Sequence, residues 1–247
     1  MLEVKNTVVT NLGRSLNAAG NAFSIGEIDS RWTEIDSIHE NFFSSINEDE
    51  RLKRNIKPYQ RSLGRNAEAH QSHDHYLCGI GVTFDIKYPL YWSPEFQRYH
   101  FSEIISSQST MHCLTNAGKR EDFDKLFNKY VDPSIISTVK NMIDDYNHTV
   151  EELKTLKTKM NMCFEWEKPA TDILIEDKQN EVYEKFMKVR SNLPSGYEMW
   201  MTVETNYLEL KTILKQRTNH KLKEDWGAFC NWIHTLPLFD YLTQKGE

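Results

Sequence analysis

The stretch YLCGIGVTFDIKYPLYW, residues 76–92, is the clearest strand signal in the chain. It is rich in β-branched and aromatic residues and carries few charges, a composition typical of a strand inside a sheet. Pro89 cannot donate a hydrogen bond to a neighbouring strand, so we expect it to end the pairing or to mark a sheet edge. A second, weaker strand is predicted around Val4, Val8 and Val9.

Most of the remaining sequence favours helices. Asp132-Pro133 combines an N-cap residue with proline at the first helical position, and predicts a long amphipathic helix that ends near Met160. The other predicted elements are helices over 32–57, 170–190, 202–218 and 224–235, and a polar loop over 61–75. The predicted class is therefore α+β, a modest central sheet, antiparallel or mixed, with long helices packed on it.

Composition restricts the possible partners. The chain has 247 residues, which suit one large domain or two small ones, and its 30 Lys+Arg against 36 Asp+Glu give a net charge of -6. An acidic protein is a poor binder of duplex nucleic acid, although a local basic pocket for a small phosphorylated ligand remains compatible with this charge. No apolar run approaches the roughly 20 residues of a membrane span, and the N-terminus lacks a signal-peptide pattern. We expect a soluble, cytoplasmic protein without nucleic-acid or membrane partners.

Neither cysteines nor histidines form a recognisable metal or redox motif. Cys78, Cys113, Cys163 and Cys230 contain no C-x-x-C pair, and each is interpreted as a small buried apolar residue, with a catalytic thiol as the alternative. His70, His73 and His75 surround Asp74 in the predicted loop, but their spacing matches no zinc signature, so a solvated or ligand-contacting loop is preferred and no metal is predicted. The P-loop and G-x-G-x-x-G motifs are also missing, which argues against a Rossmann dinucleotide site.

Arginines beside aromatic residues are the main candidates for ligand binding. Arg98, Arg190 and Arg217 each lie near the end of a predicted element, and Arg217 follows Asn206 by about three helical turns. A guanidinium group suits phosphate and carbonyl oxygens. A single arginine is more often a surface ion-pair partner, but three such positions favour an anionic ligand. We expect Arg217 in particular to be exposed and to face the ligand.

Two stretches resemble the flavin-dependent thymidylate synthases, the ThyX family. TFDIKYPLYWSPEFQRYHF (83–101) is similar to the family segment T-F-x-[IV]-K-x-P…Q-x-x-R-H-R, and it keeps Thr83, Phe84, Lys87, Pro89 and Arg98. A later stretch is similar to the pattern R-x-x-L-P…N…R…H, with Arg190, Leu193, Pro194, Asn206, Arg217 and His220. The resemblance covers roughly residues 75–235.

The resemblance implies a single ThyX-like domain over 1–247 that forms a homotetramer with active sites between subunits. It implies reductive methylation of dUMP to dTMP, with FAD as cofactor, methylene-tetrahydrofolate as carbon donor and NADPH as reductant. No cysteine attacks the pyrimidine in this family, so the protein has to hold flavin and base together and polarise ring carbonyls. Trp92, Tyr99 and Phe101 are candidates to stack on these rings, although core packing is the commoner role of such residues.

The resemblance also implies roles for individual residues. The catalytic residues would be Arg217 and Ser109. The residues that contact FAD would be Arg98, His100, Asn206, His220 and His75, of which His220 is one position out of register and His75 aligns only across an insertion. The residues that contact dUMP would be Arg98, Ser109, Arg190 and Arg217.

The signature also departs from the family. Its glutamine three residues before Arg98 is Glu95, R-H-R is Arg98-Tyr99-His100, and a later acidic residue and arginine are Ser107 and Met111. Glutamate for glutamine and methionine for arginine weaken a phosphate site through local charge, which His100 or His112 would compensate if protonated. Two alternatives therefore stay open: a flavoenzyme of the same fold that modifies another pyrimidine nucleotide, and a non-catalytic nucleotide-binding homologue.

Overall fold

The structure is a computed structural model, and it describes residues 2–21, 25, 53, 56–66, 73–162, 164 and 168–244. The chain divides into two compact units. Unit 1 comprises Met1–Tyr88, Trp92–Ser107 and Trp200–Glu247, and unit 2 comprises Pro89–Tyr91 and Gln108–Met199. The chain passes repeatedly between the units, and the single domain expected over 1–247 stays a prediction.

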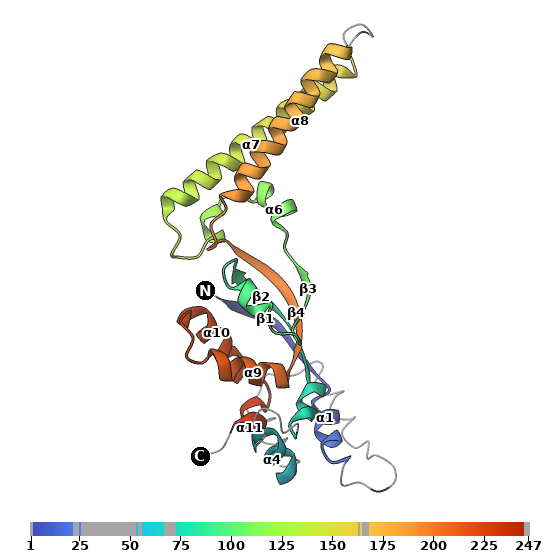
Figure 1. Cartoon of the computed structure of the whole chain (residues 1–247), viewed down its shortest axis with the longest axis vertical. Helices are drawn as coiled ribbons and strands as arrows, with labels where there is room; N and C mark the ends of the chain where they lie inside the picture. Colours follow the sequence, from blue (N-terminus) through green and yellow to red (C-terminus); the bar gives the residue numbers. More distant parts are fainter. Residues whose placement is uncertain are drawn as a thin grey trace. The chain divides into compact units, whose positions relative to one another are not determined.

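A four-stranded sheet of order β1-β2-β4-β3 lies almost wholly in unit 1 (Figure 1). Its strands are β1 (Glu3–Thr10), β2 (Gly81–Pro89), β3 (Glu103–Ser107) and β4 (Glu198–Asn206). β1 pairs antiparallel with β2, and β3 pairs antiparallel with β4. Between β2 and β4, Tyr207 N donates to Ile80 O and the Thr202 hydroxyl donates to Asp85. Residue numbers therefore increase along β2 in the direction in which they decrease along β4, so these two strands are antiparallel. The whole sheet is therefore antiparallel, which confirms the predicted α+β class.

The strand predicted from residues 76–92 is β2, and its burial explains its sequence. Val82, Phe84, Ile86 and Tyr88 are buried while the residues between them are half-buried, the period of two expected of a strand in a sheet. The strand ends at Pro89, as predicted.

The helix predicted over 202–218 is wrong in its first five residues. Met201, Val203 and Thr205 are buried at alternate positions, so this segment continues β4, and helix α9 (Tyr207–Arg217) begins only after Asn206. The segment forms a strand rather than a helix because β4 pairs with a strand on each side, β2 and β3.

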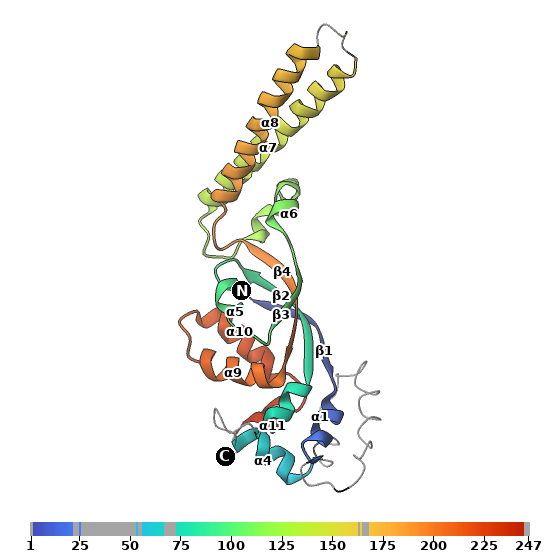
Figure 2. The same ribbon diagram turned by 45° about the vertical axis from the view of Figure 1, so that its right-hand side comes forward.

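The helices of unit 1 are short. They are α1 (Leu12–Ala18), α4 (Pro58–Asn66), the 3-10 helix η2 (His75–Gly79), α5 (Ser93–Phe96), α9, α10 (Lys223–His234) and α11 (Phe239–Thr243). α10 packs on one face of the sheet, where the ring of Trp232 lies 4.4 Å from that of Phe84 (Figure 2). The helix predicted over 224–235 is α10 and is confirmed.

The polar loop predicted over 61–75 is wrong for residues 61–66, which belong to α4. Tertiary contacts stabilise this helix, because the buried side chain of Gln60 donates to Leu16 O at 2.5 Å and its backbone oxygen accepts from the Tyr76 hydroxyl. Residue 75 begins η2. His70, Cys163 and most of the helix predicted over 32–57 lie outside the described residues.

Unit 2 consists mainly of a helical hairpin. It contains α6 (Thr110–Ala117), the 3-10 helix η3 (Phe123–Leu126), α7 (Pro133–Met160) and α8 (Lys168–Ser191), and α7 and α8 lie side by side in both ribbon views (Figures 1 and 2). The Asp132 carboxylate accepts from Ser134 N at 2.8 Å, so the predicted N-cap is confirmed, as are the end of α7 at Met160 and the helix predicted over 170–190.

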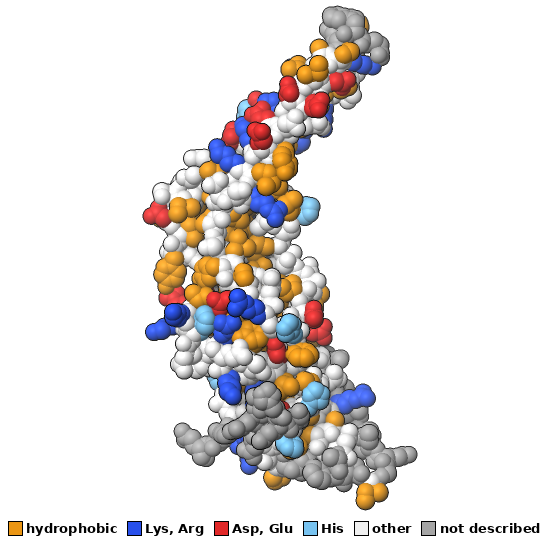
Figure 3. All heavy atoms as spheres, viewed as in Figure 1, with side chains coloured by type: hydrophobic (Ala, Val, Ile, Leu, Met, Phe, Trp, Pro, Cys, Tyr) orange, Lys and Arg blue, Asp and Glu red, His pale blue; other side chains and the backbone are white. Residues whose placement is uncertain are grey.

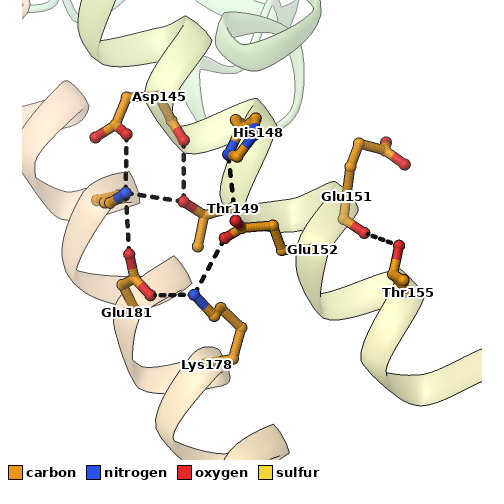
Figure 4. A network of polar contacts seen from close by, with 9 residues as sticks. Asp145, His148, Thr149, Glu151, Glu152, Thr155, Lys178 and Glu181 are labelled. Carbon is orange, nitrogen blue, oxygen red and sulfur yellow. Dashed lines mark hydrogen bonds and ion pairs between the residues drawn. The ribbon is translucent and has the colours of Figure 1, made fainter. Parts of the chain in front are cut away.

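Acidic and basic side chains are interspersed along the surface of the hairpin (Figure 3), and several of them form ion pairs. Lys185 Nζ reaches Asp145 at 2.8 Å and the buried Thr149 hydroxyl at 2.9 Å, and Lys178 joins Glu152 to Glu181 (Figure 4). Ion pairs of this exposed kind stabilise little, so the hairpin depends mainly on its buried apolar residues, Val139, Ile143, Ile175 and Val189. Within the described residues, no helix has the length and apolar character required to cross a membrane.

Candidate functional site

A tight turn after α5 presents two of the predicted ligand-binding residues. Tyr99 O accepts from Ser102 N at 3.1 Å, which closes a turn with His100 and Phe101 at its centre. Tyr99 is buried, whereas Arg98 and His100 are exposed. Arg98 has no hydrogen bond or ion pair with any residue that the structure describes, so its guanidinium group is available to a ligand.

Arg217, in contrast, is already paired within unit 1. Its Nη1 lies 2.9 Å from Glu95 Oε2, its Nε donates to the Tyr99 hydroxyl at 2.6 Å, and its guanidinium lies 4.3 Å from the centre of the Trp226 ring. The side chain is 14% exposed. The expectation that Arg217 is exposed is therefore wrong, because a carboxylate and two aromatic rings hold it at the end of α9.

Glu95 is the centre of this cluster. The same oxygen that pairs with Arg217 also accepts from Trp226 Nε1 at 3.0 Å and lies 3.4 Å from His220 Nε2. His220 Nδ1 accepts from Leu222 N at 3.2 Å, which leaves Nε2 as the protonated nitrogen that faces Glu95. Nδ1 of His220 is thus occupied and Nε2 faces Glu95, and the glutamate neutralises the charge of Arg217.

Asn206 caps helix α9. Its side-chain oxygen accepts from Glu209 N at 3.0 Å, while its amide nitrogen has no hydrogen-bond partner among the residues described. The role of Asn206 in contacting FAD stays a prediction. If Asn206 donates a hydrogen bond to FAD from its side chain, the amide nitrogen is the donor.

Glu209 connects α9 to the turn. Its carboxylate accepts a backbone hydrogen bond from Phe101, and burial raises the pKa of this carboxyl group, although that hydrogen bond and the charge of His100 act in the opposite direction. Glu209 is not among the site residues predicted from the sequence. A glutamate three positions after an N-cap asparagine is, however, the spacing of a capping box, and this signal makes Glu209 identifiable from sequence.

His75 lies on η2 beside a cysteine. His75 is exposed, with Nδ1 3.8 Å from Cys78 Sγ. Burial raises the pKa of the Cys78 thiol, and the negative charges of Asp74 and Glu209 raise it further, so this pair is not an activated nucleophile.

The other cysteines divide between core and surface. Cys230 is buried, as predicted, and burial raises the pKa of its thiol. Cys113 is exposed, so its interpretation as a buried apolar residue is wrong. Within the described residues, no group of three histidine, cysteine or acidic side chains is arranged to hold a metal ion. Asp74 instead pairs with Lys211 at 2.6 Å.

Ser109 and Arg190 both contact Met111 in unit 2, at the start of α6. The Ser109 hydroxyl is the N-cap and accepts from Met111 N at 3.2 Å. Arg190, one residue before the end of α8, directs Nη1 to the sulfur of Met111. Arg98 and Arg217 belong to unit 1 and Arg190 to unit 2, so the convergence of the three arginines on one ligand stays a prediction.

The three candidate stacking residues differ sharply in exposure. Trp92 is fully buried and packs on Phe96 and Trp226, and Tyr99 is buried beneath Arg217, so both belong to the core. Phe101 is 65% exposed. Of these three, only Phe101 presents its ring for stacking.

Comparison with known proteins shows the fold. No protein-family model matches the chain, and no curated protein matches its sequence. Thymidylate synthase X (ThyX) from Helicobacter pylori, solved with FAD and dUMP, superposes with a TM-score of 0.52 at 14% identity, over 98% of this chain and 96% of that one.

Two further solved structures are more distant. A second Helicobacter pylori ThyX structure, complexed with FAD and dUMP, has a TM-score of 0.48 over 98% of this chain and 99% of that one. The UMP/dUMP methylase PolB from Streptomyces cacaoi, bound with 5-Br dUMP, has a TM-score of 0.40 over 98% and 91%; both are 14% identical to this chain. These two scores are too low to support an argument. The first match establishes that the chain has a ThyX-like fold, as the sequence resemblance implied.

Proposed function

We propose that this chain is a divergent flavin-dependent thymidylate synthase, which methylates dUMP to dTMP. The observation that carries the proposal is the ThyX-like fold along 98% of the chain, shared with a ThyX that was solved with FAD and dUMP. The chain keeps Arg98, Arg190, Asn206 and Arg217 from the family pattern on this fold.

The side chains available in unit 1 fit the chemistry of FAD. A free guanidinium group on Arg98 and the exposed imidazole of His100 suit diphosphate oxygens, and the amide nitrogen of Asn206 suits a ring carbonyl. His75 is exposed and can join them, whereas Nδ1 of His220 already accepts from Leu222 N and its Nε2 faces Glu95, so His220 acts through Glu95. When bound, FAD supplies the hydride and helps to pass the one-carbon group.

The proposed contacts to dUMP come from both units. Arg98 and Arg190 are exposed guanidinium groups suited to phosphate. Arg217 is oriented by Glu95 and Tyr99, which leaves Nη2 to polarise a pyrimidine carbonyl. The Ser109 hydroxyl accepts a backbone hydrogen bond, so its own proton remains available for donation to the substrate.

Methylene-tetrahydrofolate as carbon donor, NADPH as reductant and a homotetramer complete the proposal. They rest on the family resemblance. A tetramer of 29.1 kDa chains has a mass of about 116 kDa, four times that of one chain, which light scattering after size exclusion measures directly.

One observation favours a second candidate, an enzyme of this fold that modifies another pyrimidine nucleotide. Glu95 neutralises Arg217 where the family has an uncharged glutamine, so the site offers less positive charge to a phosphate than the family pattern implies. A changed pocket on a retained fold is a common route to a changed substrate.

The test is a substrate comparison. The purified chain is reduced with NADPH in the presence of FAD, and carbon transfer from labelled methylene-tetrahydrofolate is followed with dUMP, dCMP or dUTP. We expect labelled dTMP from dUMP, and loss of transfer in Arg98→Ala but not in Arg120→Ala, whose arginine is an exposed partner of Asp122. Transfer to another nucleotide selects the second candidate, and flavin-free protein without transfer contradicts both.

A further inference from the structure

The turn at residues 99–102 carries a feature that turn chemistry does not explain. Central positions of tight turns favour small or polar residues, whereas here the second central residue is Phe101, with a 65% exposed aromatic ring. Most of this ring therefore lies outside the core of unit 1.

The backbone that carries this ring is nonetheless fixed at several points. Phe101 O accepts from the Thr205 hydroxyl at 3.0 Å, and the backbone N–H of Phe101 is close enough to the buried Glu209 carboxyl group to lower its pKa. The next residue, Ser102, shares a hydrogen bond of 3.0 Å with the same hydroxyl of Thr205. β4 and α9 therefore hold the turn on its inner side, and the phenyl ring lies on its outer side.

Two further exposed side chains precede Phe101 in the chain. Arg98 and His100 are both exposed, and the guanidinium group of Arg98 has no acidic partner within the described part of the chain. An exposed aromatic ring, with an exposed arginine three positions and an exposed histidine one position before it, suits a ligand that combines a planar heteroaromatic ring with phosphate. A fixed backbone lowers the entropic cost of binding such a ligand.

We propose that Phe101 is a ring-stacking residue for a phosphorylated heteroaromatic ligand, a flavin or a pyrimidine nucleotide, and that Glu209 and Thr205 hold it in place. This inference rests on the proposed function and names a residue that the family pattern does not mark. Stacking uses the face of the ring, so it tolerates replacement of phenylalanine by another aromatic residue but not by an aliphatic one.

The test measures binding. FAD is titrated into the full chain and followed by quenching of flavin fluorescence, and dUMP is titrated separately into the FAD-loaded chain by calorimetry. Phe101→Leu keeps an apolar side chain without a ring, and Phe101→Trp restores a ring. Ile105→Ala is the matched control, because Ile105 is a 57% exposed apolar residue of the neighbouring strand β3. Circular dichroism and the melting temperature confirm that each variant is folded.

We expect Phe101→Leu to lower the affinity for one of the two ligands roughly tenfold. The affinities of Phe101→Trp and Ile105→Ala should stay within about twofold of those of the parent chain. The titration that changes identifies the ring that stacks. Parent-like affinities for both ligands in Phe101→Leu overturn the inference and leave the proposed function intact. A change of molecular mass in Phe101→Leu without loss of affinity also overturns it, because the ring then faces another copy of the chain. Binding of neither ligand by the parent chain overturns the proposed function and this inference with it.

Discussion

Glu95 determines how much positive charge Arg217 can offer to a ligand. One carboxylate oxygen accepts from Arg217 and Trp226 and lies beside protonated Nε2 of His220, so Glu95 acts both as an orienting group and as a counter-charge. The sequence identifies Glu95 as a departure from the family pattern. It cannot show that the departure is compensated by an ion pair, because the partners lie more than a hundred positions away.

Glu95→Gln separates these two roles. The amide oxygen still accepts hydrogen bonds, but the charge of Arg217 is no longer neutralised. We expect FAD-loaded Glu95→Gln to bind dUMP roughly three- to tenfold more tightly at low salt, with the gain lost at high salt. Calorimetric titration at two ionic strengths measures this, with the exposed Glu103→Gln as control. Unchanged or weaker binding in Glu95→Gln would show that Arg217 does not act on the nucleotide through its charge.

Asn206 combines a structural role with a proposed ligand contact, and substitution can separate them. Asn206→Ala removes the cap of α9 and is expected to lower the free energy of unfolding by about 1 kcal/mol. Asn206→Asp keeps a capping oxygen and should restore stability, but it removes the amide donor, so FAD affinity should stay low. Denaturant unfolding and FAD titration of both variants test this. Full FAD affinity in Asn206→Asp would show that Asn206 only caps α9 and makes no amide contact with FAD.

At the scale of elements, the contact between α9 and the turn at residues 99–102 contains a buried carboxyl group. Because burial raises the pKa of Glu209 in the folded state, its contribution to stability is present below its unfolded pKa, about 4.3, and is lost as the pH rises through the folded value. Glu209→Gln keeps a hydrogen-bond acceptor and cannot ionise.

We therefore expect the stability of Glu209→Gln relative to the parent chain to increase as the pH is raised from about 4.3 toward neutrality. Urea unfolding of both proteins at several pH values measures the difference. A constant difference would mean that folding does not shift the pKa of Glu209, and a difference that falls with rising pH would mean that the carboxyl group is stabilised as an anion, for example by His100; either result contradicts the prediction.

In unit 2, the contact between α7 and α8 includes a fully buried hydroxyl group. Thr149 Oγ1 accepts from Lys185 Nζ and donates to Asp145 O. Thr149→Val keeps the shape and removes both bonds, so we expect a loss of about 1 kcal/mol. Thr155→Val is the matched control, since the Thr155 hydroxyl makes the same kind of bond to the helix backbone but is exposed; its effect should stay within about 0.5 kcal/mol. Equal losses in both variants would assign the effect to helix propensity.

Local signals predicted many elements well. Alternating burial in β2, the Asp132-Pro133 start of α7 and the Leu193-Pro194 break after α8 are all visible in the sequence. The errors have physical causes. Residues 61–66 look like a loop because their helix depends on contacts with distant residues, and residues 202–206 were assigned to a helix because β4 passes into α9 without a glycine or proline between them.

At the scale of the whole molecule, the proposed function requires two separate groups of residues to contact one ligand. Arg98, Asn206, His220 and Arg217 lie in unit 1, and Ser109 and Arg190 lie in unit 2. That both groups serve one site is part of the proposed function and stays a prediction. Sequence could not predict the internal pairing of Arg217 or the exposure of Phe101, since both result from tertiary packing.

The most direct measurement is a crystal structure of the chain with FAD and dUMP. We expect one bound flavin and one bound nucleotide to lie together and to accept hydrogen bonds from Arg98 and Arg217. An Arg190, from the same chain or from a partner subunit, should contact the same pair of ligands. A structure in which the ligands bind elsewhere, or in which these guanidinium groups face separate surfaces, would contradict this expectation.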